Sequence, residues 1–300
     1  MLPQKPLYRD TMPDVSIIIP SRNEIFLEKT VTDLLTKAEG DIEVIPILDG
    51  YWPVPPLPDD NRLKIIHRGT PLGMRAAINA GAAIAKGRYL MKCDAHCMFE
   101  KGYDTVLKAD CEDNWIVVPR RMRLDAENWI IRESDKKKVP IDYEFLSSPG
   151  YHGAKGNRWD QRSAERLNDP KYVIDENMSF QGSCWFMTKK HYDNFLHGMS
   201  EVGYGTFVRE AQEIGLKTWL GGGKVMTNKK TWYAHLHKGP QYGRMYFIDR
   251  RRMNEGNAYC DDYWFNNRWE EAKHDLAWLV ERFWPVPSWT PELLEQVRKK

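Results

Sequence analysis

Two residues with metal-binding side chains, Asp94 and His96, directly follow the apolar segment 88–92. If that segment is a strand, both side chains point to the same side, because side chains alternate along an extended chain. A carboxylate and an imidazole at the carboxyl end of a strand suit a divalent cation such as Mn²⁺, and a diphosphate could complete its ligands. Any exposed turn could carry Asp-x-His, so the elements around the pair must decide its meaning.

The composition limits the classes of function. There are 44 basic and 42 acidic residues, a formal net charge of +2, so no global field attracts nucleic acid. Local basic clusters stand at 120–123, 136–138 and 250–252. Cys93, His96 and Cys97 suggest zinc, but no second ligand pair has the spacing of a structural zinc site. We expect the five cysteines to be reduced, as in a cytosolic protein. Without a signal peptide or an apolar run near eighteen residues, we expect a soluble, cytoplasmic protein.

The first half of the chain alternates strand and helix patterns. We expect strands at 15–20, 42–48, 63–67, 88–92 and 115–119, and helices at 26–37 and 74–85. This alternation predicts an α/β fold with a doubly wound, mainly parallel sheet, which binds ligands at the carboxyl ends of its strands.

The second half is less regular. Residues 120–177 show no clear periodicity, which is typical of a substrate-facing insertion. Regular patterns return as a strand over 180–187, helices near 190–196 and 206–216, and a helical tail from 245 that ends at Pro285.

Ordered motifs along the chain resemble a known family. They are residues 15–24, Asp49-Gly50, residues 73–81, Asp94-x-His96, residues 181–186, residues 207–213, Trp219 and Gly222-Gly223. In this order they resemble nucleotide-sugar glycosyltransferases of the GT-A fold, family 2-like. The strongest similarity is to the catalytic domain of polypeptide N-acetylgalactosaminyltransferases, which carry Asp-x-His. The resemblance implies a GT-A domain over 1–244, with an acceptor-side insertion at about 120–177, and a C-terminal helical extension over 245–300 packed on it.

The resemblance also implies roles for single residues. Asp94, His96 and His235, which stands twelve residues after Gly223, would bind Mn²⁺ or Mg²⁺, with His237 as the alternative to His235. The residues implied to bind the nucleotide, with uridine favoured as its base, are Pro20, Arg22, Asp49, Arg75 (not in strict register) and Lys238. Asp94 and Glu210 are the implied catalytic residues, whereas Glu213 is as readily a structural helix residue.

Departures from the family pattern concern the substrates and the stereochemistry. The family's Trp-Gly-Gly is Phe207-Val208-Arg209 here, which fills space that is open for substrate in the family and leaves the donor sugar undetermined. Inverting relatives often carry an aspartate base directly after the motif glutamate, where this chain has Ala211. We therefore expect transfer with retention, and Glu210 as an acceptor ligand or a base.

The acceptor is left open by the sequence. Compact, soluble glycosyltransferases of bacteria and their viruses, which this chain resembles, modify envelope glycans, small metabolites and hydroxymethylated DNA bases. Basic clusters at 120–123 and 136–138, with Trp129 and Trp159, would suit DNA and a flipped base, or else an acidic glycan. The alternative function is that of a catalytically inactive relative that binds nucleic acid or a sugar.

Overall fold

The structure is a computed structural model that describes residues 12–298, so the ends of the predicted domain and extension, residues 1–11 and 299–300, lie outside the described residues. Strands and helices alternate through the first half of the chain, as expected. Ten strands of the described part form the main sheet: β1 (Val15–Ser21), β2 (Ile42–Asp49), β3 (Ile66–Arg68), β4 (Tyr89–Cys93), β5 (Cys97–Phe99), β6 (Trp115–Asp125), β7 (Ile130–Ile131), β10 (Ile174–Glu176), β11 (Cys184–Thr188) and β12 (Lys224–His235). Two more, β8 (Glu144–Leu146) and β9 (Gly156–Arg158), form a small antiparallel pair.

The main sheet has the strand order β10-β12-β6-β11-β4-β1-β2-β3, with β5 paired to β12 and β7 paired to β6. Strands β3, β2, β1 and β4 are parallel, and so are β6 and β12. Only β11 and β10 run antiparallel to their neighbours along this path of described strands. The mainly parallel α/β sheet predicted from the alternating pattern is confirmed.

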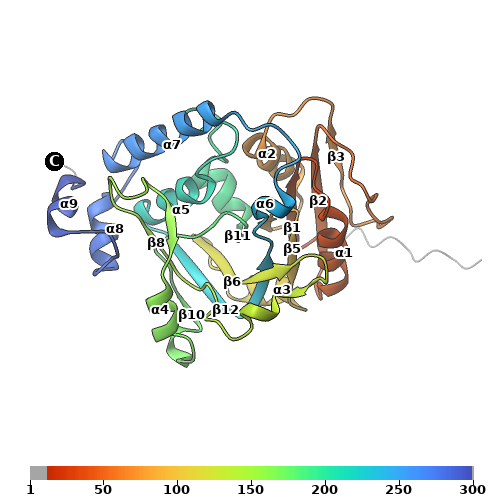
Figure 1. Ribbon diagram of the computed structural model, residues 1–300, viewed down its shortest axis with the longest axis horizontal. Helices are drawn as coiled ribbons and strands as arrows, with labels where there is room; N and C mark the ends of the chain where they lie inside the picture. Colours follow the sequence, from red (N-terminus) through yellow and green to blue (C-terminus); the bar gives the residue numbers. More distant parts are fainter. Residues whose placement is uncertain (1–11, 299–300) are drawn as a thin grey trace, which may run out of the picture.

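Helices cover both faces of this sheet (Figure 1). They are α1 (Leu27–Lys37), α2 (Met74–Ile84), α3 (Tyr103–Ala109), α4 (Asp160–Glu165), α5 (Glu210–Leu220), α6 (Gly239–Tyr242), α7 (Arg250–Phe265), α8 (Leu276–Arg282) and α9 (Pro291–Gln296). Short helical turns are η1 (Glu133–Asp135), η2 (Pro170–Tyr172) and the π-helical η3 (His191–Leu196). In the described part, no helix is both long and apolar enough to cross a membrane.

Two cores lie on either side of the sheet. Along β1, Ile17 and Ile19 pack on the side of α1 and α3, whereas Ile18 packs on the side of α2 and α5. Since side chains alternate along a strand, burial of both sets means that both faces are covered. This explains why β1 and β2 are apolar at successive positions and show no polar alternation.

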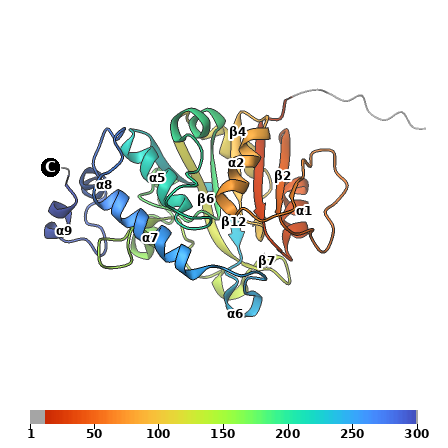
Figure 2. The same cartoon turned by 90° about the horizontal axis from the view of Figure 1, so that it is seen from above.

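The C-terminal helices extend the core on the α5 side. Trp264, Trp269, Leu276 and Phe283 share one buried cluster with Trp219 of α5. Figures 1 and 2 show α8 and α9 at the end of the molecule opposite α1 and β2. Many of the tryptophans are therefore core residues and are not available as stacking platforms for a ligand. The boundary between residues 244 and 245 stays a prediction.

Region 120–177 is more regular than its sequence indicated. The expectation that the chain leaves the sheet at Pro119 is wrong, because β6 continues to Asp125 beside β12. Pro119 lies opposite Asn228, where the pairing register shifts before Trp232. A strand can carry a proline at such an irregularity, because a ladder hydrogen bond is already missing there. Further along this region, β10 returns to the sheet as its edge strand.

Helix α5 begins later than the sequence pattern predicted. The expected helix over 206–216 is observed at Glu210–Leu220, because Arg209 has a φ angle of 58° and so interrupts the helical backbone. The helical tail also divides into α7 and α8, and α9 follows beyond Pro285.

Candidate metal and nucleotide site

The carboxyl ends of β4 and β12 bring Asp94, His96 and His235 together. Asp94 follows the last residue of β4, and its backbone N–H donates to the Ser183 carbonyl at 2.9 Å. The chain then turns into β5, which pairs with β12 so that Cys97 lies opposite His235. Residues far apart in sequence therefore meet at the edge of the sheet where ligands of open α/β sheets bind.

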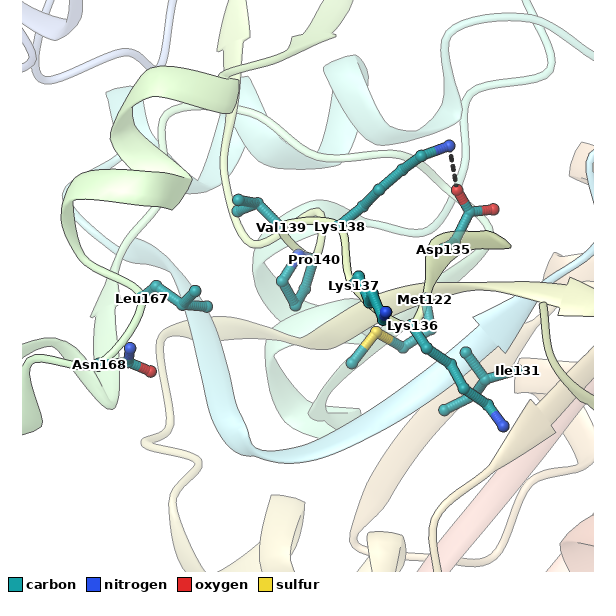
Figure 3. Close-up of a pocket in the computed structure, with 10 residues that line it drawn as sticks. All are labelled: Met122, Ile131, Asp135, Lys136, Lys137, Lys138, Val139, Pro140, Leu167 and Asn168. Atoms are coloured by element: carbon teal, nitrogen blue, oxygen red, sulfur yellow. Dashed lines mark ion pairs between the residues drawn. The ribbon is translucent and has the colours of Figure 1, made fainter. Parts of the chain in front are cut away.

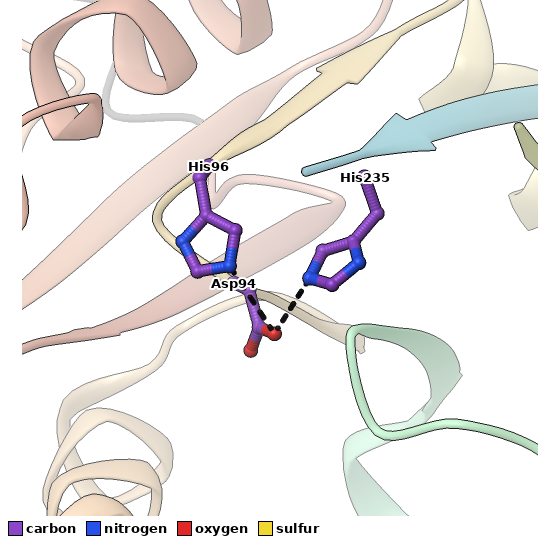
Figure 4. Close-up of side chains that lie close together, drawn as sticks. All are labelled: Asp94, His96 and His235. Carbon is purple, nitrogen blue, oxygen red and sulfur yellow. Dashed lines mark hydrogen bonds and ion pairs between the residues drawn. The ribbon is translucent and has the colours of Figure 1, made fainter. Parts of the chain in front are cut away.

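The three side chains converge on one point (Figure 4). His235 Nε2 lies 3.2 Å from Asp94 Oδ2, and His96 Nε2 lies 4.0 Å from the same oxygen. One ligand atom of each residue lies within 4.8 Å of the other two. His237, the alternative third ligand, is not in this group and stands edge-on to the His235 ring, with 5.1 Å between ring centres.

Burial and neighbouring charges set the protonation of this group. Burial lowers the pKa of His235 to about 3, so its imidazole is neutral and can offer a lone pair. Burial alone would raise the pKa of Asp94, but Lys92 and His235 together hold it well below its ordinary value. A neutral imidazole and an ionised carboxylate are the forms that bind a metal ion.

Glu24 supports the cluster from the loop after β1. Its Oε2 lies 3.3 Å from His96 Nδ1, on the side of the ring away from Asp94, and both of its oxygens accept from Lys238 Nζ at 2.5 and 2.6 Å. Burial alone would raise the pKa of Glu24, but His96 and Lys238 lower it. A carboxylate behind a metal-binding histidine fixes the ring orientation. Lys238, predicted to contact phosphate, is thus held beside the cluster by an acid.

A buried lysine joins Asp94 to Glu210. Lys92 Nζ donates to Asp94 Oδ1 at 2.8 Å, to Glu210 Oε2 at 3.1 Å and to the Gly182 carbonyl at 2.5 Å. Burial alone would lower the pKa of Lys92, but the two carboxylates raise it, so its ammonium stays charged. Glu210 Oε1 accepts from Trp185 Nε1 at 2.6 Å. Both oxygens of Glu210 are therefore engaged, and burial raises its pKa.

The residues predicted to bind the nucleotide lie at the ends of β1 and β2. Pro20 and Arg22 stand at the carboxyl end of β1, and the Arg22 guanidinium lies 4.6 Å from the ring centre of Tyr246. Asp49 ends β2, and its two oxygens accept the backbone N–H groups of Leu72 and Gly73 at 2.9 and 2.8 Å. Asp49 thus fastens the loop before α2 to the same edge of the sheet.

The structure corrects the expectation for Arg75. Its side chain is 1% exposed and forms an ion pair with Glu213. It also donates to the carbonyls of Ser200 at 3.0 Å and Val208 at 2.6 Å. Arg75 therefore holds the segment before α5 from inside and cannot reach a nucleotide. Glu213 has the structural role that its helix position allowed.

The basic clusters of region 120–177 are largely neutralised. Arg120 makes two 2.8 Å hydrogen bonds to Asp142, Arg121 pairs with Glu144 at 2.7 Å, and Arg123 pairs with Asp135 at 3.0 Å. Lysines 136–138 border a hollow of about 360 Å³ with Met122, Ile131 and Leu167 (Figure 3). Lys138 pairs with Asp135 at 2.7 Å and Lys136 pairs with Glu133.

Trp129 and Trp159, which favoured a DNA acceptor in the sequence, both contact other parts of the protein. Trp129 donates its indole N–H to Asp33 at 3.1 Å, and Trp159 is buried against Phe145. Trp159 is therefore closed to a flipped base, whereas Trp129 is partly buried and has Lys29 Nζ 5.5 Å from its ring centre.

Sequence reasoning missed two residues of the site, Lys92 and Glu24. The signal for Lys92 was present, because a lone lysine between Met91 and Cys93 in a buried strand must find acidic partners. Alternation also places it on the same side as Leu90, towards α5. Glu24 stood within a matched motif, but its partners come from residues 72 and 214 positions later in the chain.

Comparisons with known proteins agree with the fold. Residues 16–163 match the family described as Glycosyl transferase family 2. No curated protein matches the sequence.

Two solved structures share the fold. The crystal structure of GalNAc-T7 with UDP, GalNAc and Mn²⁺ is similar with a TM-score of 0.61 at 16% identity, over 97% of this chain and 55% of that one. The crystal structure of S. aureus TarS 1–349 in complex with UDP-GlcNAc is similar with a TM-score of 0.50 at 13% identity, over 89% of this chain and 70% of that one. This chain thus spans about half the length of the GalNAc-T7 chain.

Proposed function

We propose that the chain, which has a GT-A fold, is a glycosyltransferase that moves a sugar from a UDP-linked donor to an acceptor hydroxyl, with retention and with a bound Mn²⁺ or Mg²⁺. The observation that carries the proposal is the convergence of Asp94, His96 and His235 at the carboxyl edge of the sheet. The ligands of the similar structures, UDP with Mn²⁺ in GalNAc-T7 and UDP-GlcNAc in TarS, support the choice of donor and cation.

The three side chains fit a divalent cation. The proposed ligand atoms are Asp94 Oδ2, His96 Nε2 and His235 Nε2, a mixed carboxylate and imidazole set that suits Mn²⁺. Glu24 holds the His96 ring from behind, and Lys92 holds the second oxygen of Asp94. When bound, the cation supplies Lewis-acid stabilisation of the charge on the diphosphate leaving group.

The nucleotide pocket in this proposal lies between the ends of β1 and β2. Pro20 and Arg22 form one wall, and Asp49 with its attached loop forms the other. Arg22 has no carboxylate within 4.0 Å among the described residues, so its charge is available to a phosphate. Lys238 would reach the diphosphate from the opposite side, where Glu24 holds it.

The stereochemical part of the proposal rests on Glu210. An inverting transfer needs a side-chain base beside the attacking hydroxyl. The position of that base in inverting relatives is Ala211, and Glu210 is held by Lys92 and Trp185 at 5% exposure. A proton acceptor would have to leave these partners first. We therefore favour retention, with Glu210 fixing Asp94 through Lys92.

The proposed acceptor is a glycan or a small sugar-like hydroxyl compound. The basic residues that favoured a modified DNA base are paired with acids, and Trp129 and Trp159 are packed. A protein that binds DNA needs unpaired basic side chains to contact the phosphates of the DNA backbone. A DNA acceptor is thus the less supported candidate.

Calorimetric titration of the chain with UDP, with and without Mn²⁺, tests the proposal. UDP should bind at least about tenfold more tightly with Mn²⁺, and more tightly than GDP, ADP or dTDP. Asp94→Ala should abolish this Mn²⁺-dependent gain in affinity, since the loss of even an outer-sphere partner of a bound metal costs about 10–100-fold. The matched control is Asp14→Ala, an exposed carboxylate at the other end of the sheet. Binding of UDP that ignores Mn²⁺ and Asp94 would contradict the proposal.

A further inference from the structure

Arg209 stands where the resembling family has a glycine, and it keeps a glycine-like backbone. Its φ and ψ angles are 58° and 29°, in the left-handed region that favours glycine. A long cationic side chain thus stands on a backbone conformation that favours glycine. Backbone strain of this kind concentrates at functional sites.

The guanidinium of Arg209 is poorly satisfied. Within residues 12–298 no carboxylate lies within 4.0 Å of it. Its one hydrogen bond is long, 3.5 Å from Nη2 to the carbonyl of His152, and its Nε is buried without an acceptor. Arg75 and Arg121, which are also near α5 or the sheet edge, both have a glutamate partner. A guanidinium has five donors in a planar fork, so most of the donors of Arg209 remain free for a ligand.

Arg209 is linked through the chain to the proposed reaction centre, while its guanidinium lies against the segment that holds His152. Arg209 immediately precedes Glu210, which shares the ammonium of Lys92 with the metal-ligand candidate Asp94. Two residues earlier, the Phe207 ring lies 4.8 Å from the guanidinium carbon of Arg244.

The segment that carries Arg244 is attached to the other side of the site. The side chain of Asn23 donates to the Met245 carbonyl at 2.9 Å, and Arg22 stacks on Tyr246 at 4.6 Å. Segment 244–246 thus connects the end of β1 to the start of α5. By these contacts Arg22 and Arg244 belong to one edge of the molecule, and Phe207, which Arg244 contacts, lies two residues before Arg209.

The basic side chains at this edge outnumber the negative charges that nearby acids and a UDP-sugar with a neutral sugar would supply. Lys92 and Lys238 are matched by Asp94, Glu210 and Glu24. Within the described chain, Arg22, Arg244 and Arg209 have no acid within 4.0 Å. The diphosphate of a UDP-sugar carries two negative charges, which a divalent cation already offsets. With Arg22 assigned to the diphosphate in the proposed function, Arg209 and Arg244 are left for an additional anion on the substrate.

We propose that Arg209 is a specificity-determining residue that binds a carboxylate or phosphate group on the sugar substrate. This inference rests on the proposed function and names the substrate class of the same site. The anionic group belongs either to the transferred sugar, as in a hexuronate, or to the acceptor. In either position a planar carboxylate or phosphate can take two parallel hydrogen bonds from the guanidinium fork.

Two experiments distinguish these sources in the presence of Mn²⁺. In the donor arm, the affinity of UDP-glucuronate is compared with that of UDP-glucose by calorimetry. In the acceptor arm, the chain loaded with UDP is titrated with methyl glucuronoside or glucose 6-phosphate, against methyl glucoside and glucose. We expect a preference for the anionic compound of at least about tenfold in one arm, since a hydrogen bond to a charged group contributes about 1.5–3 kcal/mol.

The variants assign that preference to one side chain. Arg209→Gln and Arg209→Gly should both reduce the preference to within about twofold. Glycine adopts the observed φ angle of Arg209 without strain, so Arg209→Gly should fold even if Arg209→Gln is destabilised. The matched control is Arg88→Gln, a 71% exposed arginine just before the amino end of β4, which should keep the preference.

The outcomes separate this inference from the function beneath it. Equal binding of anionic and neutral compounds in both arms would overturn the role of Arg209, and so would a preference that survives Arg209→Gln. Failure of every UDP-sugar to bind, neutral or anionic, would instead contradict the proposed function.

Discussion

Two basic regions of the molecule differ in how densely their charges stand in the sequence and in what those charges contact. Region 120–138 carries the densest clusters of arginine and lysine, yet Arg120 and Arg121 pair with buried acids. At the carboxyl edge, Arg22 and Arg209 are isolated in the sequence and have no acid within 4.0 Å among the described residues. The clusters support the fold, whereas the isolated arginines are free to meet a ligand.

This difference shows that a basic side chain is available to a ligand when it lacks an acidic partner in the fold. The number of basic residues near it in the sequence matters less. A buried ion pair is held in place because each partner would be costly to leave alone. Its guanidinium therefore offers little to an anionic ligand. An unpaired guanidinium at a ligand-binding edge keeps its full hydrogen-bonding capacity.

The largest effect that would sharpen this comparison is expected at Lys92. Lys92→Met removes the ammonium that Asp94 and Glu210 share. The Lys92 side chain is only 1% exposed, so water cannot easily replace it. Leaving buried charges without a partner costs about 3–5 kcal/mol of unfolding free energy, and urea unfolding would measure the loss.

A second substitution tests the cause of that loss. Lys92→Met combined with Glu210→Gln removes one of the two uncompensated carboxylates and should recover part of the stability, which a double-mutant cycle would report. If the double variant is as unstable as the sum of the two single variants, the ion pair is not the cause.

A smaller effect is expected at a buried base that has no acid partner. His191 of η3 shares a 2.9 Å hydrogen bond with Thr218, and burial lowers its pKa from 6.5 to about 4. Between these pH values the unfolded chain binds a proton that the folded chain does not bind. The unfolding free energy should therefore fall as the pH decreases from about 6.5 to about 4, by up to about 3 kcal/mol from this group.

Variants isolate this contribution from that of other histidines. The stability advantage of the wild type over His191→Gln should shrink on acidification, as measured by urea unfolding at pH 7 and pH 4. The exposed His67 provides the control, because His67→Gln should leave the pH dependence unchanged. An advantage of the wild type over His191→Gln that is constant with pH would contradict the assignment.

The parts of the fold that the sequence predicted are those with local signals. The strands that became β1, β2 and β4, and the helices α1 and α2, followed from apolar runs ended by proline or glycine. The continuation of β6 past Pro119 could not be seen, because it depends on a register shift in its partner β12. The late start of α5 depended on the left-handed backbone of Arg209, which the sequence does not announce.

The candidate site was predicted to a similar extent. Asp94 and His96 were chosen from strand alternation, and His235 from the family resemblance. The three do converge, but Asp94 and His96 lie in the turn between β4 and β5, so alternation within a strand is not what brings them together. The role of Arg75 was misjudged because its partner Glu213 and the carbonyls of the 200–208 segment are distant in the sequence. Charge pairing across the fold is the information that the sequence lacked.

The smallest effect on stability and binding is expected from lysines 136–138. Replacing all three by glutamine should change the unfolding free energy by less than about 1 kcal/mol, because exposed ion pairs contribute little. Asp135 would keep Arg123 as a partner at 3.0 Å. Binding of UDP, and the preference for an anionic sugar, should stay within about twofold of wild type. If the triple variant instead loses that preference as Arg209→Gln is expected to, the hollow beside Met122 and Leu167 is the anion site, and the distinction between the two basic regions is wrong.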